Sequence, residues 1–86
     1  MPEICRFYGI VIKMYFADHA PPHFHAEYAE FEARIAIDSL AVISGKLPPR
    51  AMGLVAEWTT LHQQDPTTLW EKARRFEPLA RLDPLP

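Results

Sequence analysis

The hydrophobic pattern of this chain changes its period once, near residues 45–49, and this change constrains the fold most. Before this segment apolar residues tend to alternate with polar ones, as in β-strands, and after it they recur every three or four positions, as in helices. Pro48 and Pro49 mark the switch, because proline interrupts a strand ladder and suits the first turn of a helix. The pattern predicts an α+β fold in one domain, 1–86, with strands over about 4–44 and helices after them.

The first half predicts a small antiparallel sheet of three to four strands. A strand over 10–16 is followed by a hairpin of strands 23–28 and 31–38 around Ala29-Glu30, and a last strand covers 39–44. The residues predicted to face the core are Ile10, Ile12, Met14, Phe16, Phe24, Ala26, Tyr28, Phe31, Ala33, Ile35, Leu40 and Val42, with Ile43 as a further candidate. With a two-residue turn, the other face of the hairpin pairs His23, His25 and Glu27 with Ala36, Arg34 and Glu32.

Two helices are predicted, over 48–64 and 66–76, followed by an extended tail over 77–86. Asp65 is the expected N-cap of the second helix, and Pro66 is its expected first residue. The apolar residues expected to pack these segments are Ala51, Leu54, Val55, Trp58 and Leu61 in the first helix, Leu69, Ala73 and Phe76 in the second with Trp70 on its flank, and Leu79 and Leu82 in the tail.

Composition excludes several classes of protein. With 86 residues, 49% of them hydrophobic, and a net charge of -2, the chain is too apolar for a disordered protein and not basic enough for a dedicated nucleic-acid binder. No apolar stretch approaches the roughly 18 residues of a membrane-spanning helix, and no signal peptide is recognised. The single Cys5 can form no internal disulfide, so a cytoplasmic location is expected.

Three histidines are clustered between the first strand and the hairpin, in the run Asp18-His19-Ala20-Pro21-Pro22-His23-Phe24-His25. We call residues 18–25 the histidine loop. On a strand, His23, His25 and Glu27 project to the same side, with about 6 to 7 Å between successive Cβ atoms. Imidazole and carboxylate groups at this spacing suit a divalent metal such as Zn, Fe or Ni, and His19 can approach the same ion. The alternative is a solvated or hydrogen-bonded histidine pair, because Arg34 opposite His25 opposes cation binding.

The same residues are candidates for acid–base catalysis. His19 or His23 would transfer protons, with Asp18 or Glu27 as the orienting carboxylate. Arg34 would stabilise negative charge, and such an arrangement suits phosphodiester cleavage. The enzymatic hypothesis is therefore a small metal- or histidine-dependent hydrolase, for example a ribonuclease, with catalytic candidates His19, His23, His25 and Arg34.

Binding roles are predicted from other features of the chain. Pro21 and Pro22 stiffen the histidine loop, and a rigid loop suits docking because it loses little entropy on binding. Lys72, Arg74 and Arg75 are interleaved with acidic residues, so they form no continuous basic stripe for nucleic acid, although phosphate contact is open to them. An outer strand of the sheet can also accept a partner strand.

Several runs of residues resemble a bacterial family of small proteins, domain-of-unknown-function family 4160: Gly9–Tyr15, Asp18–Tyr28 with its Pro-Pro-His-Phe-His-Ala signature, Gly45–Pro48 and Leu54–Trp58. The resemblance covers nearly the whole chain. It implies a stand-alone bacterial protein that is frequently encoded beside another small protein, in a pairing similar to toxin–antitoxin modules. The matching signature residues, which would form the binding face, are Asp18, His19, Pro21, Pro22, His23, His25 and Tyr28. Relatives tend to carry glycine near Ala29-Glu30, so the resemblance leaves the tightness of this hairpin turn open.

Two functional hypotheses result, and the sequence leaves open whether the chain is an enzyme. The first is a partner-binding component of a small paired-gene module, toxin–antitoxin-like or regulatory, with the histidine loop as functional face and a small bacterial protein as partner. The second is the hydrolase, with a divalent metal held by His23, His25 and Glu27 where a metal is used. The first requires no cofactor, and self-association of the chain is compatible with both.

Overall fold

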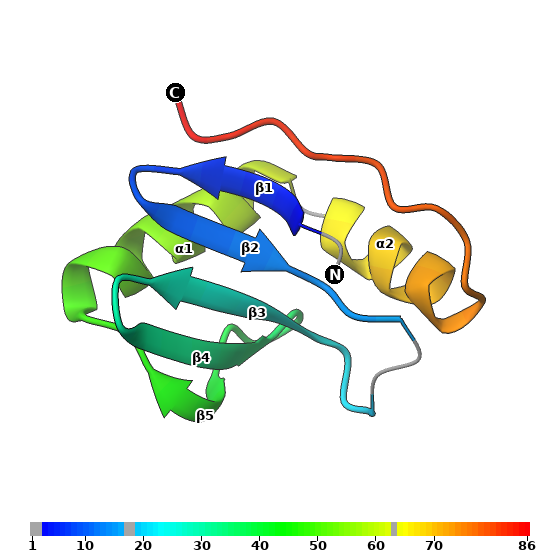
Figure 1. Cartoon of the computed structure of the whole chain (residues 1–86), viewed down its shortest axis with the longest axis horizontal. Helices are drawn as coiled ribbons and strands as arrows, with labels where there is room; N and C mark the ends of the chain where they lie inside the picture. The colour runs from blue at the N-terminus through cyan, green and yellow to red at the C-terminus, as the bar shows by residue number, and fades with distance from the viewer. Residues whose placement is uncertain (1–2, 17–18, 63) are drawn as a thin grey trace.

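The computed structural model describes residues 3–16, 19–62 and 64–86, and it shows an antiparallel sheet of five strands (Figure 1). The strands follow one another across the sheet in chain order: β1 (Glu3–Phe7), β2 (Ile10–Lys13), β3 (His23–Tyr28), β4 (Phe31–Ala36) and β5 (Val42–Lys46). The α+β class is confirmed, whereas the predicted count of three to four strands is wrong.

The strand absent from the prediction is β1. It joins β2 through a two-residue turn at Tyr8 and Gly9, whose φ angles are +49° and +81°, and Phe7 pairs with Ile10 across this turn. Both turn residues lie in the left-handed region, as the tightest hairpin turns require. Because tyrosine is uncommon in that region, the sequence indicates a bend at Gly9 without indicating a hairpin.

The register predicted for the β3–β4 hairpin is confirmed. Tyr28 pairs with Phe31 next to the turn, and His25 lies opposite Arg34. Ala29 adopts a left-handed conformation, with a φ of +52°, at a position that a glycine would occupy without strain. Burial of every second residue on the core face specifies this register even though the turn residues are unfavourable.

Strand β5 differs from the predicted last strand over 39–44. Its pairing with β4 skips Ile43, an extra residue that bulges out of the ladder between Val42 and Ser44. The side chains of Val42 and Ile43 are 46% and 44% exposed, so the prediction that they face the core is wrong. A bulge shifts the alternation of faces by one residue, and a regular two-residue period does not reveal it.

Two helices follow the sheet: α1 (Pro49–His62), which passes behind the strands in Figure 1, and α2 (Asp65–Arg74), which lies to the right of them. The N-cap of α2 is Gln64 rather than the predicted Asp65, whose carboxylate instead contacts the His62 ring, with Nδ1 and Oδ2 3.2 Å apart. Trp70 is buried in the core rather than on a flank, and Leu61 is exposed because its side of the last turn of α1 lines an open groove. No helix in the described ranges is long and apolar enough to cross a bilayer.

Trp58 of α1 is the centre of the core. It is fully buried, stacks on Phe7 of β1 with 5.6 Å between ring centroids, and meets Phe24 of β3 edge-on at 6.0 Å. Its indole Nε1–H donates to the Asp83 carbonyl oxygen at 2.9 Å. This side chain therefore connects the helix layer to two strands and to the C-terminal tail.

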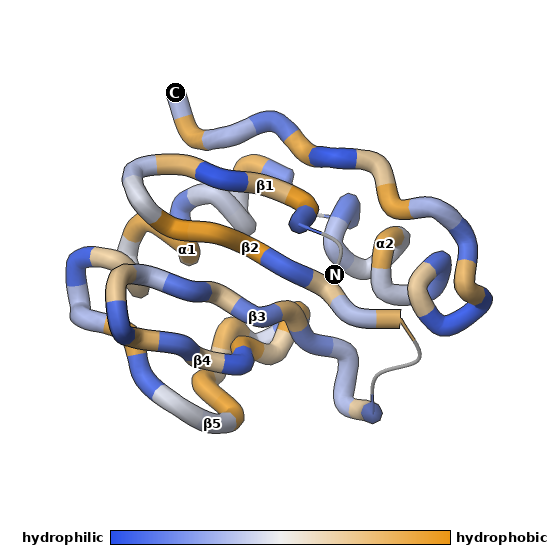
Figure 2. Tube along the Cα trace, in the orientation of Figure 1, coloured by the Kyte–Doolittle hydropathy of each residue, from blue (hydrophilic) through white to orange (hydrophobic). Residues whose placement is uncertain are grey.

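The tail, residues 77–86, runs beside β1 at one edge of the sheet (Figure 1). The Leu82 N–H donates to the Ile4 carbonyl at 2.8 Å and the Tyr8 hydroxyl donates to the main-chain oxygen of Pro86, so the tail is parallel to β1. Hydrophobic residues alternate with hydrophilic ones along it in Figure 2. The predicted packing of the tail is confirmed, and its leucines on the core are Leu79, Leu82 and Leu85.

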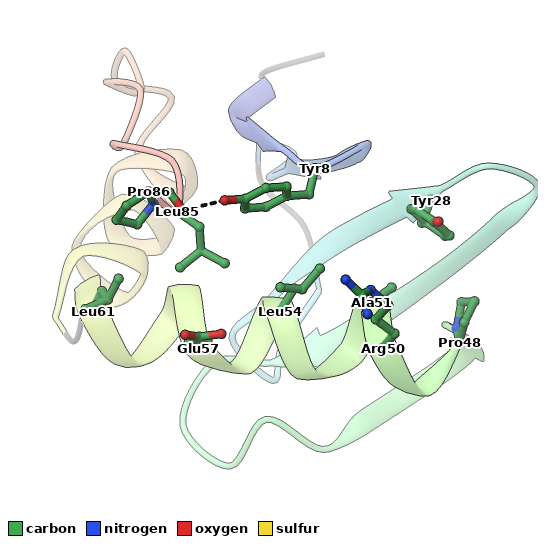
Figure 3. Close-up of a pocket in the computed structure, with 10 residues that line it drawn as sticks. All are labelled: Tyr8, Tyr28, Pro48, Arg50, Ala51, Leu54, Glu57, Leu61, Leu85 and Pro86. Atoms are coloured by element: carbon green, nitrogen blue, oxygen red, sulfur yellow. Dashed lines mark hydrogen bonds between the residues drawn. The ribbon is translucent and has the colours of Figure 1, made fainter.

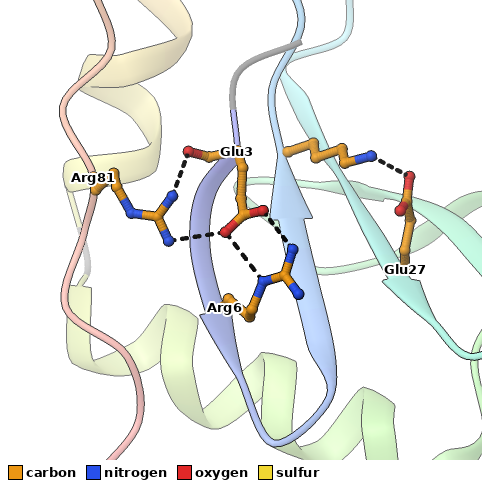
Figure 4. Close-up of polar contacts among 5 residues, drawn as sticks. Glu3, Arg6, Glu27 and Arg81 are labelled. Atoms are coloured by element: carbon orange, nitrogen blue, oxygen red, sulfur yellow. Dashed lines mark hydrogen bonds and ion pairs between the residues drawn. The ribbon is translucent and has the colours of Figure 1, made fainter.

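Ion pairs fasten the tail to β1 (Figure 4). The Glu3 carboxylate accepts hydrogen bonds from Arg6 of the same strand and from Arg81 of the tail, each at 2.8 Å. These hydrogen bonds lower the pKa of Glu3 from 4.5 to about 2. Because the pKa is lower in the folded state than in the unfolded state, the carboxylate stabilises the fold above its unfolded pKa, and this stabilisation is lost as the pH falls towards the folded value.

We therefore expect the substitution Glu3→Gln to lower the stability of the fold only at pH values at which Glu3 is ionised. The difference in urea midpoint between wild type and Glu3→Gln should be fully present near about pH 6 and should be largely lost near about pH 2, as the linkage of protonation to folding requires. Glu71→Gln, on the exposed side of α2, is the control for loss of a carboxylate in general. A Glu3→Gln difference that is the same at both pH values would contradict the assignment.

Candidate functional site

The histidine loop covers the end of the connection between β2 and β3 and the first three residues of β3, and the backbone at its two prolines is stiff. Pro21 and Pro22 restrict the backbone, and the peptide bond between Ala20 and Pro21 is cis. The Pro22 carbonyl accepts a hydrogen bond from the Ile37 N–H at 3.1 Å, which fixes the loop to the end of β4. His19 is exposed, as are Ala20, Pro21 and Pro22. Asp18, a predicted binding residue, lies outside the described residues.

The two histidines of the loop that lie in β3 are buried. His23 and His25, at the start of β3, are only 4% and 6% exposed. Their ring centroids are 5.2 Å apart, His23 also packs on Trp70 of α2 at 5.2 Å, and Tyr15 meets His25 edge-on at 4.4 Å. We call these four side chains, Tyr15, His25, His23 and Trp70, the aromatic row. The two histidines are thus part of a packed row rather than a solvated pair.

The loop backbone orients the His23 ring. The Nδ1 atom of His23 lies 2.7 Å from the Pro21 carbonyl oxygen. Because a carbonyl oxygen only accepts hydrogen bonds, Nδ1 carries a proton in this contact. The stiff Pro21-Pro22 backbone therefore sets both the orientation and the proton position of an imidazole that also packs against Trp70.

Glu27, the third predicted metal ligand, is engaged in an ion pair. Its carboxylate lies 3.0 Å from Lys13 Nζ (Figure 4), and this contact raises the pKa of Lys13. Within residues 3–16, 19–62 and 64–86, no three His, Cys, Asp or Glu side chains are grouped so that they could hold a metal ion. Metal binding by His23, His25 and Glu27 stays a prediction to which the described geometry adds no support.

The remaining predicted site residues are spread along the sheet. Arg34 is exposed and lies opposite His25 in the register, so these two catalytic candidates are brought together. Tyr28 lies at the far end of β3 and packs against the core, about 17 Å along the strand from His23. Cys5 is buried, and burial raises the pKa of its thiol, so it is a poor nucleophile.

An exposed pair of phenylalanines lies next to the histidine loop. Phe16 follows the end of β2 and Phe76 follows α2, and their rings stack with centroids 6.1 Å apart and an angle of 15° between planes. They are 41% and 69% exposed, so the prediction that both face the core is wrong. Strand β2 ends at Lys13, before the two-residue alternation reaches Phe16, and Phe76 has a φ of +58° beyond the last helical residue. The proline at position 78 is the sequence signal that α2 ends early.

Comparison with known protein families gives a match, and it includes the histidine loop. The sequence model of a family described as a domain of unknown function, DUF4160, matches residues 9–71, which is most of the chain. The chain belongs to this family. The resemblance noted from the Pro-Pro-His-Phe-His-Ala signature is thereby confirmed. No curated protein and no solved structure matches the chain.

The DUF4160 match separates the site into two parts. It contains the histidine loop and all four side chains of the aromatic row. Strand β1, Phe76 and the tail lie outside it. The buried base of the loop thus belongs to the segment that this chain shares with DUF4160, whereas one of the two exposed phenylalanines beside the loop does not.

Proposed function

We propose that this DUF4160 protein is a cytoplasmic, partner-binding component of a small paired-gene module, toxin–antitoxin-like or regulatory. Its contact face is the histidine loop together with Phe16 and Phe76. The observation that carries the proposal is the exposed, stacked phenylalanine pair beside a proline-stiffened loop that rests on a buried aromatic row.

The energetics of this face favour protein recognition. Aromatic side chains supply much of the binding energy in protein interfaces, and Phe16 and Phe76 offer two rings that are already oriented by stacking. The loop is held by Pro21, Pro22 and the hydrogen bond to Ile37, so little conformational entropy is lost when a partner binds. An exposed apolar pair next to a rigid loop that presents His19 combines apolar contact area with a polar group, as small interfaces do.

The alternative function, a metal- or histidine-dependent hydrolase such as a ribonuclease, rests on one observation. His25 lies opposite Arg34, so a proton-transfer group and a cation are adjacent on one face of the sheet. The burial of the His23 and His25 rings within the aromatic row limits their access to a substrate, and for this reason we place partner binding first.

The test is capture of a defined partner, the small protein encoded beside this chain. Phe76→Ala should weaken its binding about tenfold or more, measured by titration calorimetry, because truncation of an exposed aromatic anchor removes contact area at the interface centre. The folding midpoint should stay unchanged, since Phe76 is 69% exposed. Leu61→Ala is the matched control, because Leu61 is 61% exposed but lies at the last turn of α1.

Equal affinities of the two variants for this partner would contradict the proposed face. An RNA-cleaving activity of the purified chain that His25→Ala abolishes and Phe76→Ala leaves intact would instead establish the hydrolase. Wild type and these three variants, Phe76→Ala, Leu61→Ala and His25→Ala, thus distinguish the two functions.

A further inference from the structure

A groove lies at the end of the sheet opposite the histidine loop. It has a volume of about 890 Å³ and is formed by the exposed side of α1, the turns that follow β1 and β3, and the end of the tail (Figure 3). Tyr8 and Tyr28 line the groove on the side of the sheet, and Leu54 lines it on the side of α1 (Figure 3). Cavities of this size hold ligands, yet neither the DUF4160 match nor the histidine loop assigns a role to this one.

The tail supplies an extended segment at the border of the groove. Leu85 and Pro86 line one end of it, and Leu85 is 9% exposed. The Tyr8 hydroxyl donates a hydrogen bond to the main-chain oxygen of Pro86. The border of the groove therefore already combines a leucine–proline segment of the chain with an aromatic hydroxyl that donates to a main-chain oxygen of that segment. Pockets for polyproline II segments have the same character, because they combine aromatic walls with donors to backbone carbonyls.

Two oppositely charged side chains of α1 line the groove. Arg50 and Glu57 are both exposed, and both line it from α1. They are seven residues apart on the helix, which corresponds to about 10.5 Å along its axis. In a polyproline II segment, residues i and i+3 lie on one face about 9.3 Å apart. A peptide with one acidic and one basic residue three positions apart thus matches the spacing of these two charges.

We propose that the groove binds a proline-rich peptide segment in the polyproline II conformation, with an acidic residue at Arg50 and a basic residue at Glu57. Prolines and leucines of the segment pack against Tyr8, Tyr28 and Leu54, next to the end of the groove that Leu85 and Pro86 line. This site is separate from the proposed partner face, because it is built from the opposite ends of the strands.

The probe is a blocked synthetic peptide, acetyl-Pro-Leu-Pro-Glu-Pro-Leu-Lys-Pro-Leu-Pro-amide, added to the full chain. Amide chemical shifts should change saturably at Tyr8, Tyr28 and Leu54. Arg50→Glu should weaken binding about tenfold, because it replaces one exposed ion pair by a repulsion of similar size. Glutamate is favourable in the first turn of a helix, so this variant should remain folded.

For a second peptide we expect the opposite order of affinities of wild type and Arg50→Glu. When its glutamate is replaced by lysine, the peptide should bind Arg50→Glu more tightly than wild type, because both groove charges are then acidic. Arg74→Glu, an exposed reversal on α2 outside the groove, should bind both peptides as wild type does. Phe76→Ala should also bind them normally, so a failure of the proposed partner face leaves this test intact.

Three outcomes would overturn the proposal. They are no saturable shift change in the groove, shift changes confined to the histidine loop, and equal affinities of wild type and Arg50→Glu for both peptides. A concentration-dependent doubling of mass in solution that buries Tyr8 and Leu54 and excludes the peptide would assign the groove to a second copy of the chain instead.

Discussion

Trp58→Ala is expected to cost about 3 to 5 kcal/mol of folding free energy, the usual range for truncating a buried aromatic side chain to alanine. The ring of Trp58 is fully buried and touches both Phe7 and Phe24, so its loss leaves a cavity between the helix layer and two strands. The hydrogen bond from Nε1 to the Asp83 carbonyl is lost as well. Since small domains are stable by only about 5 to 15 kcal/mol, much of the chain should be unfolded or easily unfolded.

Urea denaturation followed by circular dichroism measures this effect, and Trp58→Phe serves as its control. Phenylalanine retains an aromatic ring against Phe7 and Phe24 but cannot donate to Asp83. The smaller loss expected from Trp58→Phe should be accompanied by release of the tail, seen as changed amide shifts at Leu82. A Trp58→Ala variant with the wild-type midpoint would show that the ring is not the centre of the core.

Gly45→Ala is expected to lower the stability by about 2 to 4 kcal/mol, because strain and a steric clash act together there. Gly45 has a φ of +74°, and a Cβ atom at this position would lie 2.1 Å from the Glu32 carbonyl oxygen of the neighbouring strand. Relief of this contact requires β5 to move away from β4. Because the obstacle is backbone rather than a flexible side chain, no rotamer change can remove it.

Gly53→Ala is the matched control for Gly45→Ala. Gly53 lies within α1, and a Cβ atom added there meets nothing within 4 Å. Alanine should therefore stabilise the chain by about 0.5 to 1 kcal/mol, the difference in helix propensity between the two residues. The two glycine variants should move the urea midpoint in opposite directions. A stabilising Gly45→Ala would contradict the register of β4 and β5.

The sequence pattern predicted those parts of the fold in which apolar and polar residues alternate regularly along a strand. The β3–β4 hairpin was predicted in register, because its alternation is regular and its core face is buried. Strand β1 and the bulge at Ile43 were not predicted, since a left-handed Tyr8 and one inserted residue carry no periodic signal. Leu61 is exposed because it lines the open groove, and only the assembled fold determines this groove.

Part of the candidate site could also be predicted, because strand alternation places its residues on one face of the sheet. Strand alternation correctly placed His23 and His25 on one face, opposite Ala36 and Arg34. It could not reveal that Trp70 of α2 closes over His23, because this contact joins segments nearly fifty residues apart. The stacking of Phe16 on Phe76 is likewise a long-range contact.

The position of the tail has a consequence for aggregation. Residues 81–86 lie along the β1 edge of the sheet, and the prolines at positions 84 and 86 have no N–H to offer to a further strand. Among the described strands, this leaves β5 as the open edge. Two molecules that join through β5 form a ten-stranded sheet whose outer borders are both sealed by tails. The tail therefore hinders strand addition at the β1 edge, which opposes the growth of a continuous sheet through both edges.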